Sequence, residues 1–248
     1  MTQKTQIKTA LITGGAARIG AEIARQLHAE GMNIVVHYRS SVNKAEQLCH
    51  SLNAIRAESA VPIHADLHQT DALPKLVAKA AASWNGLHVL VNNASSFYPT
   101  PVGEITEAQW DDLIGSNLKA PLFLSQAATP YLRESAGCIV NIVDIHAFRA
   151  MKSHPVYCAA KAGLAMLTQS LARELGPEIR VNGVAPGAIL WPASEMDAEI
   201  QASIIERTAL KRQGKPQDIA RTVRFLVMEA DYITGQVIPV DGGRSLNI

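Results

Sequence analysis

The chain has 248 residues, of which 48% are hydrophobic, and 23 Lys and Arg residues oppose 22 Asp and Glu residues to give a net charge of +1. A chain of this length can bury a substantial core, and its alternating strand and helix patterns favour one α/β domain over two. The balanced charge argues against a nucleic acid or a membrane surface as the default partner. No apolar run is long enough to span a bilayer, and residues 1–8 lack the apolar centre of a signal peptide, so we expect a cytoplasmic protein.

Seven apolar, β-rich runs predict seven strands, in chain order Thr9–Thr13, Asn33–His37, Val61–His64, Val89–Asn92, Cys138–Val143, Arg180–Ala185 and Val237–Val240. Helical patterns lie between them, at Ile19–Glu30, Lys44–Glu58, Ala72–Trp84, Ala108–Leu132, Pro155–Leu175 and Gln217–Met228. Strands with almost continuous hydrophobicity are typical of a parallel sheet that is covered on both faces. The sequence therefore predicts a single doubly wound, Rossmann-like domain.

A glycine-rich turn follows the first predicted strand, with the sequence Gly14-Gly15-Ala16-Ala17-Arg18-Ile19-Gly20. A strand that turns through small residues into a helix N-terminus presents free N–H groups and a positive dipole end, which suit a pyrophosphate. The turn is typical of a dinucleotide site, although a tight connection without a ligand would have the same pattern.

The end of the second strand bears on the choice of cofactor. A carboxylate there would bind an adenosine ribose diol and favour NAD, but His37-Tyr38-Arg39-Ser40-Ser41 offers a guanidinium and hydroxyls and no acid. The fork of Arg39 suits a 2′-phosphate, so the sequence favours NADPH; the alternative is a solvated arginine.

Tyr157 and Lys161 are four residues apart on a predicted helix, and Asp144 stands thirteen residues before the tyrosine, at the end of a strand. Residues four apart share a helix face, so we expect the Lys161 ammonium to lower the pKa of the Tyr157 phenol and make it a proton donor near neutrality. A carboxyl group in a partly desolvated cleft can hold a proton for a ring nitrogen or share one with the phenol. Asp144 could instead cap the segment that follows its strand.

Two further features complete the sequence-based interpretation. The stretch from Ala188 to Arg212 interrupts the alternation of strands and helices and is expected to cover the pocket as a substrate lid, or else to pack as a surface excursion. The three cysteines, Cys49, Cys138 and Cys158, have no metal-ligand spacing, so we expect reduced thiols and no metal site.

Taken together, these motifs resemble the short-chain dehydrogenases/reductases over almost the whole chain. The resemblance rests on Thr13-Gly14 to Gly20, Asn92-Asn93-Ala94-Ser95, Asn117, Tyr157 to Lys161 and Pro186-Gly187, in the order and spacing of that family. The chain departs from the common pattern at Arg18, where a glycine is usual, and at Asp144, where a serine is usual. Both departures are similar to pteridine reductases, as are residues 37–41 and 93–99.

The resemblance implies the roles of individual residues. Cofactor contacts are expected from Gly14, Arg18, Ile19, Gly20, His37, Tyr38, Arg39, Ser40, Asp66, Leu67, Asn93, Ala94, Ser95, Lys161, Pro186 and Gly187. Substrate contacts are expected from Arg18, Ser95, Phe97, Asp144 and Tyr157, with the Phe97 ring stacked on a pterin opposite the nicotinamide.

Several of these assignments have a structural alternative. Asp66 matches an adenine contact but could be an N-cap, and Phe97 could be an aromatic residue that anchors its loop. The asparagines at 92, 93 and 117, the last of which matches a residue that holds a proton-relay water, could instead satisfy buried backbone groups. His146, Arg149, His154 and Trp191 are expected only at the rim of the pocket.

The predicted reaction is transfer of the pro-S hydride of NADPH to a C=N bond of an oxidised or dihydro pterin, with dihydrofolate as a further candidate. The hydride face is implied by the resemblance alone. Tyr157 with Asp144 would supply the proton, and Lys161 would hold the nicotinamide ribose. A carbonyl reductase acting on an oxoacyl thioester and a non-catalytic NADPH-binding regulator are the alternatives. The resemblance also implies a homotetramer, with the helices predicted at Ala108–Leu132 and Pro155–Leu175 as the interface.

Overall fold

A computed structural model describes residues 7–191 and 197–247 of the chain, and residues 192–196 of the predicted lid lie outside the described part. Its centre is a seven-stranded sheet with the strand order β3-β2-β1-β4-β5-β6-β7, in which every neighbouring pair is parallel. The strands are β1 (Thr9–Ile12), β2 (Asn33–Tyr38), β3 (Ala60–His64), β4 (Val89–Asn92), β5 (Cys138–Ile142), β6 (Arg180–Pro186) and β7 (Val237–Val240). The prediction of a seven-stranded parallel sheet is confirmed.

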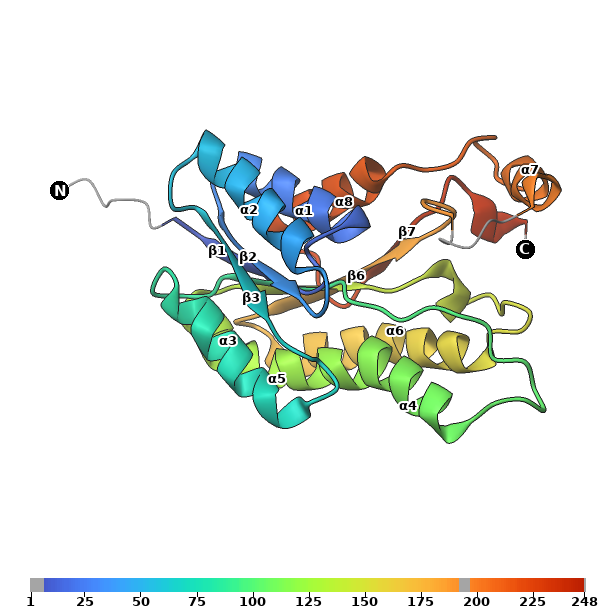
Figure 1. Ribbon diagram of the computed structural model, residues 1–248, viewed down its shortest axis with the longest axis horizontal. Coiled ribbons are helices and arrows are strands. Elements are labelled where there is room, and N and C mark those ends of the chain that lie inside the picture. Colours follow the sequence, from blue (N-terminus) through green and yellow to red (C-terminus); the bar gives the residue numbers. More distant parts are fainter. Residues whose placement is uncertain (1–6, 192–196, 248) are drawn as a thin grey trace.

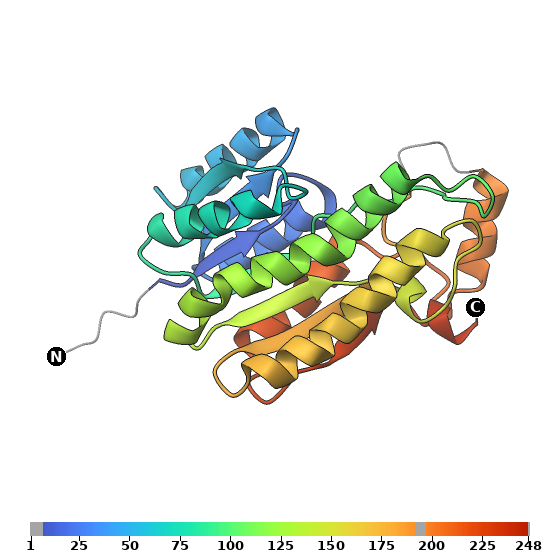
Figure 2. The ribbon, with the colours of Figure 1, turned by 90° about the horizontal axis from the view of Figure 1, so that it is seen from below.

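Helices cover both faces of this sheet (Figure 1). One layer contains α1 (Arg18–Ala29), α2 (Val42–Ile55) and α8 (Pro216–Met228). The opposite layer, which Figure 2 shows from below, contains α3 (Leu73–Ala82), α4 (Glu107–Ile114), α5 (Ala120–Glu134) and α6 (Pro155–Leu175). The predicted doubly wound architecture is therefore confirmed as well.

The strands alternate between two hydrophobic cores. Ile12 and Val36 pack into the core beneath α1, α2 and α8, whereas Leu11 and Val35 pack into the core beneath α3 and α5. Successive side chains of a strand point to opposite faces, so a strand inside a doubly covered sheet needs apolar residues at every position. This requirement explains why the strand sequences are continuously hydrophobic.

The helix predicted at Ala108–Leu132 differs from the structure, because a π-helical turn over Gly115–Lys119 separates α4 from α5. Gly115 packs against the ring of His68, where an added Cβ atom would lie 2.6 Å from Nδ1. The wider turn also buries Asn117, whose amide donates to the Leu113 carbonyl oxygen. Single π-helical turns of this kind are frequent at functional sites.

The carboxyl ends of the parallel strands all meet at one edge of the sheet, where ligands bind in folds of this type. Beyond this edge lie the helix α7 (Ala198–Glu206) and the C-terminal turn (Arg244–Leu246), on the right of Figure 1. The predicted lid thus contains one short helix among its described residues. No helix in the described part of the chain is long and apolar enough to cross a membrane.

Candidate active site

The glycine-rich turn brings its backbone close to the end of β4. Gly14 has a φ of 59°, and a Cβ atom there would lie 3.0 Å from the Ala94 Cα atom. On Gly20 a Cβ atom would lie 2.4 Å from the Gly14 carbonyl oxygen, so both positions require glycine. Helix α1 then begins at Arg18 without a side-chain cap from Ala17. This cradle of uncapped N–H groups fits a pyrophosphate.

Thr13 and Asn93 fasten this turn to β4. The Thr13 hydroxyl accepts from the N–H groups of Asn93 and Ala94 at 2.9 and 3.0 Å. The Asn93 amide donates in return to the carbonyl oxygens of Thr13 and Gly14 at 2.9 and 3.1 Å. Asn93 therefore satisfies backbone groups, as the structural alternative expected, and it does so inside the predicted cofactor site. The part played by Thr13 was not anticipated from the sequence.

His37 lies beneath the glycine turn. Its side chain is buried, Nδ1 accepts from the Gly14 N–H at 3.1 Å, and Nε2 lies 3.1 Å from the Ala65 carbonyl oxygen. Burial lowers the pKa of His37 to about 4. Both ring nitrogens are already hydrogen-bonded, so the His37 side chain has no free nitrogen for the expected contact with a cofactor.

The other residues that were predicted to contact the adenosine end of the cofactor are more accessible than His37. Arg39 and Ser40 are exposed at the end of β2, and Arg39 forms no ion pair with any residue that the structure describes. The ring of Tyr38 lies 5.5 Å from that of His64. Asp66 accepts from the backbone N–H of His68 at 3.1 Å, which agrees with the capping alternative, and leaves its second carboxylate oxygen without a described hydrogen-bond partner.

Asp144 and Tyr157 meet at the carboxyl end of β5. One carboxylate oxygen of Asp144 accepts from the His146 N–H at 2.8 Å and caps the short turn Ile145–Ala147. The other oxygen accepts from the Tyr157 hydroxyl, also at 2.8 Å. Asp144 therefore caps the turn, as the structural alternative expected, while its second oxygen contacts the phenol with which it was predicted to act.

The predicted effect of Lys161 on the tyrosine is wrong in this structure. The Lys161 ammonium donates to the Ile142 carbonyl oxygen at 2.9 Å and lies 5.7 Å from the centre of the Tyr157 ring. Burial, followed by the negative charge and hydrogen bond of Asp144, raises the pKa of Tyr157 well above its ordinary value. Burial also lowers the pKa of Lys161 to about 8. The sequence indicated which groups meet, but it did not indicate how deeply they are buried.

Phe97 presents an aromatic surface above these groups. The side chain is 41% exposed, and its ring meets that of Tyr157 edge-on, with 4.8 Å between centroids and an interplanar angle of 79°. His154, which was expected only at the rim, stacks on Phe97 at 4.9 Å and 14°. The exposure of Phe97 argues against the alternative of a residue buried to anchor its loop.

The loop that carries Phe97 is held on both sides by Asp112, which sequence analysis did not identify. The hydroxyls of Ser96 and Tyr98, the two neighbours of Phe97, donate to this carboxylate at 3.3 and 3.0 Å, and His68 Nε2 lies 3.1 Å from it. No local pattern marks Asp112, since its partners come from two other loops.

Ser95 and Asn117 form the inner end of the same loop. The Ser95 hydroxyl donates to the Asn117 side-chain oxygen at 2.6 Å, and the Asn117 amide donates to the Ser96 carbonyl oxygen at 2.9 Å. With its bond to Leu113, Asn117 therefore satisfies buried backbone groups in this structure.

Arg18 connects the glycine turn to the start of the predicted lid. Its guanidinium donates to the Trp191 carbonyl oxygen at 3.3 Å across 173 positions of sequence. Farther along the same edge, Gly187 lies so close to Asp241 that an added Cβ atom would be 2.6 Å from the Asp241 Cβ. Arg149 donates to the Ser245 carbonyl oxygen at 3.4 Å, which joins the loop after β5 to the C-terminal turn.

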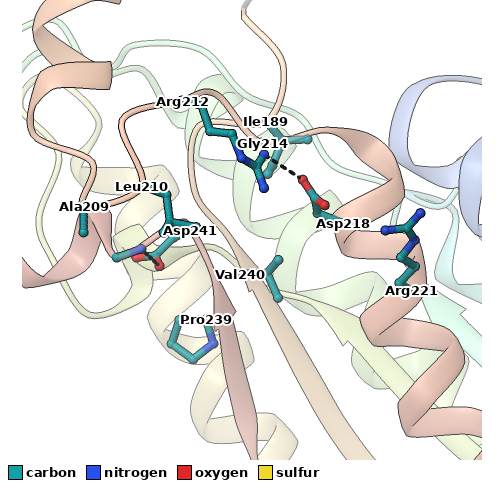
Figure 3. Close-up of a pocket in the computed structure, with 12 residues that line it drawn as sticks. Ile189, Ala209, Leu210, Arg212, Gly214, Asp218, Arg221, Pro239, Val240 and Asp241 are labelled. Carbon is teal, nitrogen blue, oxygen red and sulfur yellow. Dashed lines mark hydrogen bonds and ion pairs between the residues drawn. The ribbon is translucent and has the colours of Figure 1, made fainter.

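A separate hollow of about 540 Å³ lies beside the end of β7 and the start of α8 (Figure 3). Arg212 and Asp218 form an ion pair of 3.4 Å on its wall, and Leu210 and Pro239 contribute apolar surface. None of the site residues predicted from the sequence lines this hollow. The candidate active site is therefore the region around Asp144 and Tyr157, and not this hollow.

A doubly wound sheet with a glycine turn and a tyrosine–lysine pair defines a nucleotide-dependent oxidoreductase. A family model described as "Enoyl-(Acyl carrier protein) reductase" matches residues 14–245. The chain belongs to the short-chain dehydrogenase/reductase family, whose reductases use a nicotinamide cofactor.

Curated relatives fall into two functional groups. The 3-oxoacyl-acyl-carrier-protein reductase FabG of Staphylococcus epidermidis is 38% identical over 240 residues, which cover 95% of this chain and 98% of the relative. Pteridine reductase 1 of Leishmania tarentolae is 37% identical over 287 residues, with 99% of each chain covered. A putative ketoacyl reductase for granaticin synthesis from Streptomyces violaceoruber is 34% identical over 252 residues, again with 99% of each chain covered.

The buried His37 predicts a dependence of stability on pH. Because its pKa falls from 6.5 to about 4 on folding, the unfolded chain binds a proton between these values that the folded protein does not. The His37 contribution is complete above pH 6.5 and is lost as the pH falls towards 4, by about 3 kcal/mol in total at about 1.4 kcal/mol per pKa unit. Urea unfolding of the native protein and of His37→Gln at pH 7.5 and 4.5 measures this difference.

The variant should lose less stability than the native protein between the two pH values. His50→Gln, which changes an exposed histidine on α2, is the control and should follow the native protein. Equal losses in the native protein and in His37→Gln would contradict the neutral, buried assignment.

Proposed function

We propose that the protein is an NADPH-dependent pteridine reductase, which reduces a C=N bond of an oxidised or dihydro pterin. The observation that carries the proposal is the hydrogen bond between Asp144 and Tyr157 beside the exposed ring of Phe97. A carboxylate paired with a phenol suits protonation of a ring nitrogen, and an aromatic surface suits a flat heteroaromatic substrate.

Tyr157 and Asp144 would manage the proton. Tyr157 carries its hydroxyl proton at neutral pH, and burial beside Asp144 raises its pKa, which makes it a weaker acid than a free phenol. In this step the hydroxyl proton of Tyr157 would pass to the substrate nitrogen, and Asp144, which accepts from that hydroxyl, would hold it in one orientation. The cap at His146 fixes the carboxylate while this happens.

The nicotinamide cofactor would supply the hydride when bound. The residues that fit it are the glycine turn for the pyrophosphate, exposed Arg39 and Ser40 for the 2′-phosphate, and Asp66 for the adenine. Lys161 is mostly charged below about pH 8 and would bind the nicotinamide ribose. Tyr38, Ala94, Ser95, Pro186 and Gly187 line the same edge of the sheet and would complete the site.

Reduction of a 3-oxoacyl thioester is the second candidate, because two of the three relatives described above are ketoacyl-type reductases. Such a substrate presents a carbonyl oxygen rather than a ring nitrogen. The serine that is usual in the family, whose hydroxyl would bond that oxygen, is replaced here by Asp144. This chemistry favours the pterin.

We also propose that the chain assembles into a homotetramer through the helical layer of Figure 2. Large apolar side chains are exposed on its helices α4, α5 and α6, namely Trp110, Leu122, Phe123 and Met166. These exposed side chains support the proposal, and sedimentation equilibrium would measure the assembly.

The substrate class is tested by measuring NADPH oxidation with dihydrobiopterin, dihydrofolate and an acetoacetyl thioester side by side. We expect turnover of a pterin by the native protein, and loss of that turnover in Asp144→Ser without a large gain with the thioester. Phe97→Ala should weaken pterin binding by about 1 to 3 kcal/mol through lost ring burial and stacking.

Phe225→Ala is a matched control, since Phe225 on α8 is 38% exposed and lies outside the site. Its pterin kinetics should equal those of the native protein. Rapid thioester reduction without pterin turnover by the native protein would refute the pteridine proposal.

The role of the phenol is tested by Tyr157→Phe, which removes only the hydroxyl that bonds Asp144. Turnover should fall at least about 100-fold, the usual scale for a positioned proton donor, with NADPH binding almost unchanged. Tyr232→Phe, at a fully exposed position after α8, is the control and should retain native turnover. Native turnover in Tyr157→Phe would remove the phenol from the mechanism.

The cofactor preference is tested by Arg39→Ala. The native protein should prefer NADPH to NADH, and the variant should lose this preference mainly through the KM for NADPH. A lost charge-assisted contact to the 2′-phosphate corresponds to about 1.5 to 3 kcal/mol, or roughly 10-fold to over 100-fold in affinity. Arg221→Ala, at an exposed position on α8, should change neither KM. Equal use of both cofactors by the native protein would contradict the assignment of Arg39.

A further inference from the structure

His37 connects two loops that lie on opposite sides of the β2 end. Its Nδ1 accepts from Gly14 in the glycine turn, and its Nε2 faces the carbonyl oxygen of Ala65, directly before Asp66. Two main-chain hydrogen bonds join the same segments. The Gly15 N–H donates to the His37 carbonyl oxygen at 3.0 Å, and the Ala65 N–H donates to the Tyr38 carbonyl oxygen at 3.1 Å. The ring therefore joins the glycine turn to the Ala65–Leu67 segment, which carries Asp66, the predicted adenine contact.

Only one form of the ring satisfies both neighbours. A backbone N–H can only donate, so Nδ1 must carry a lone pair; a carbonyl oxygen can only accept, so Nε2 must carry the hydrogen. A protonated ring would direct a second N–H at the Gly14 N–H, which has no acceptor to offer. The structure thus holds His37 as a single neutral tautomer.

We propose that His37 is a positioning residue whose neutral ring sets the spacing between the glycine turn and the Ala65–Leu67 segment, and thereby the affinity for the adenosine half of the cofactor. In this role the ring itself contacts no cofactor atom. It acts through Gly14 on one side and Ala65 on the other. The inference uses the nicotinamide dinucleotide of the family and does not depend on a pterin substrate.

Three substitutions separate the two hydrogen bonds. His37→Asn places an amide oxygen near the Nδ1 position and can retain the bond from Gly14, whereas His37→Gln places an amide N–H near the Nε2 position and can retain the bond to Ala65. His37→Leu fills similar space and retains neither. His28→Gln is the control, because His28 on α1 is also buried and bonds Ser59 but touches neither loop.

The binding probe is 2′,5′-ADP, which carries the adenosine half without the nicotinamide, with 5′-AMP measured in parallel by calorimetry. We expect affinity to fall about 10-fold in His37→Leu and by smaller factors in His37→Asn and His37→Gln, as one or two hydrogen bonds are lost. The turnover number at saturating NADPH should stay within about twofold of native, because the groups around Tyr157 are unaffected. It is measured with whichever substrate of the panel above the native protein reduces fastest. His28→Gln should bind both probes like the native protein.

The tautomer is observed directly by ¹⁵N NMR of the imidazole. We expect the Nε2–H form throughout pH 5.5 to 8, with and without 2′,5′-ADP. His64 and Asp66 are the titratable neighbours, and they act on the ring in opposite directions, His64 lowering its pKa and Asp66 raising it.

Several outcomes would overturn the inference. These are native affinity for both probes in His37→Leu, an Nδ1–H tautomer, or a fall in turnover number that equals the loss of affinity. If His37→Leu does not fold, native affinity in both amide variants has the same consequence. Equal affinity of the native protein for 2′,5′-ADP and 5′-AMP would contradict the proposed NADPH preference, and not the role of His37.

Discussion

The hydrogen bonds between Thr13 and Asn93 are the constraint on which the site depends. They fasten the glycine turn, which follows β1, to the point where β4 ends and the Ser95–Phe97 loop begins. A parallel sheet brings the carboxyl ends of these strands to one edge but does not fix the loops that leave them. Here one side-chain pair fixes both loops, so the residues predicted to contact the cofactor and those predicted to contact the substrate share a single anchor.

Asp144 holds two partners at once. Its first oxygen ends β5 by capping the following turn, and its second oxygen accepts from Tyr157. The cap restricts the rotation of the carboxylate, which is why the second oxygen faces the phenol. A serine has one side-chain oxygen and could not occupy both positions, so the aspartate also changes how firmly the loop after β5 is held.

The sequence predicted the elements and the chemical partners better than their environments. The strands were recognisable because both faces of the sheet are covered and every strand position is apolar. The same uniformity hid His37, since burial on both faces leaves no alternation to show that its ring points inward. The break at Gly115 was hidden for a different reason, because it depends on the ring of His68 from another loop. Asp112 and the stacking of His154 on Phe97 likewise arise only when distant segments meet.

The bond from Arg18 to position 191 is directed at a main-chain carbonyl oxygen. An acceptor of this kind is present whatever side chain the residue carries, so the bond between the glycine turn and the segment that begins at Ala188 does not depend on the indole of Trp191. The side chain at position 191 can therefore change without loss of this bond. A substitution of Arg18, in contrast, would remove the bond itself.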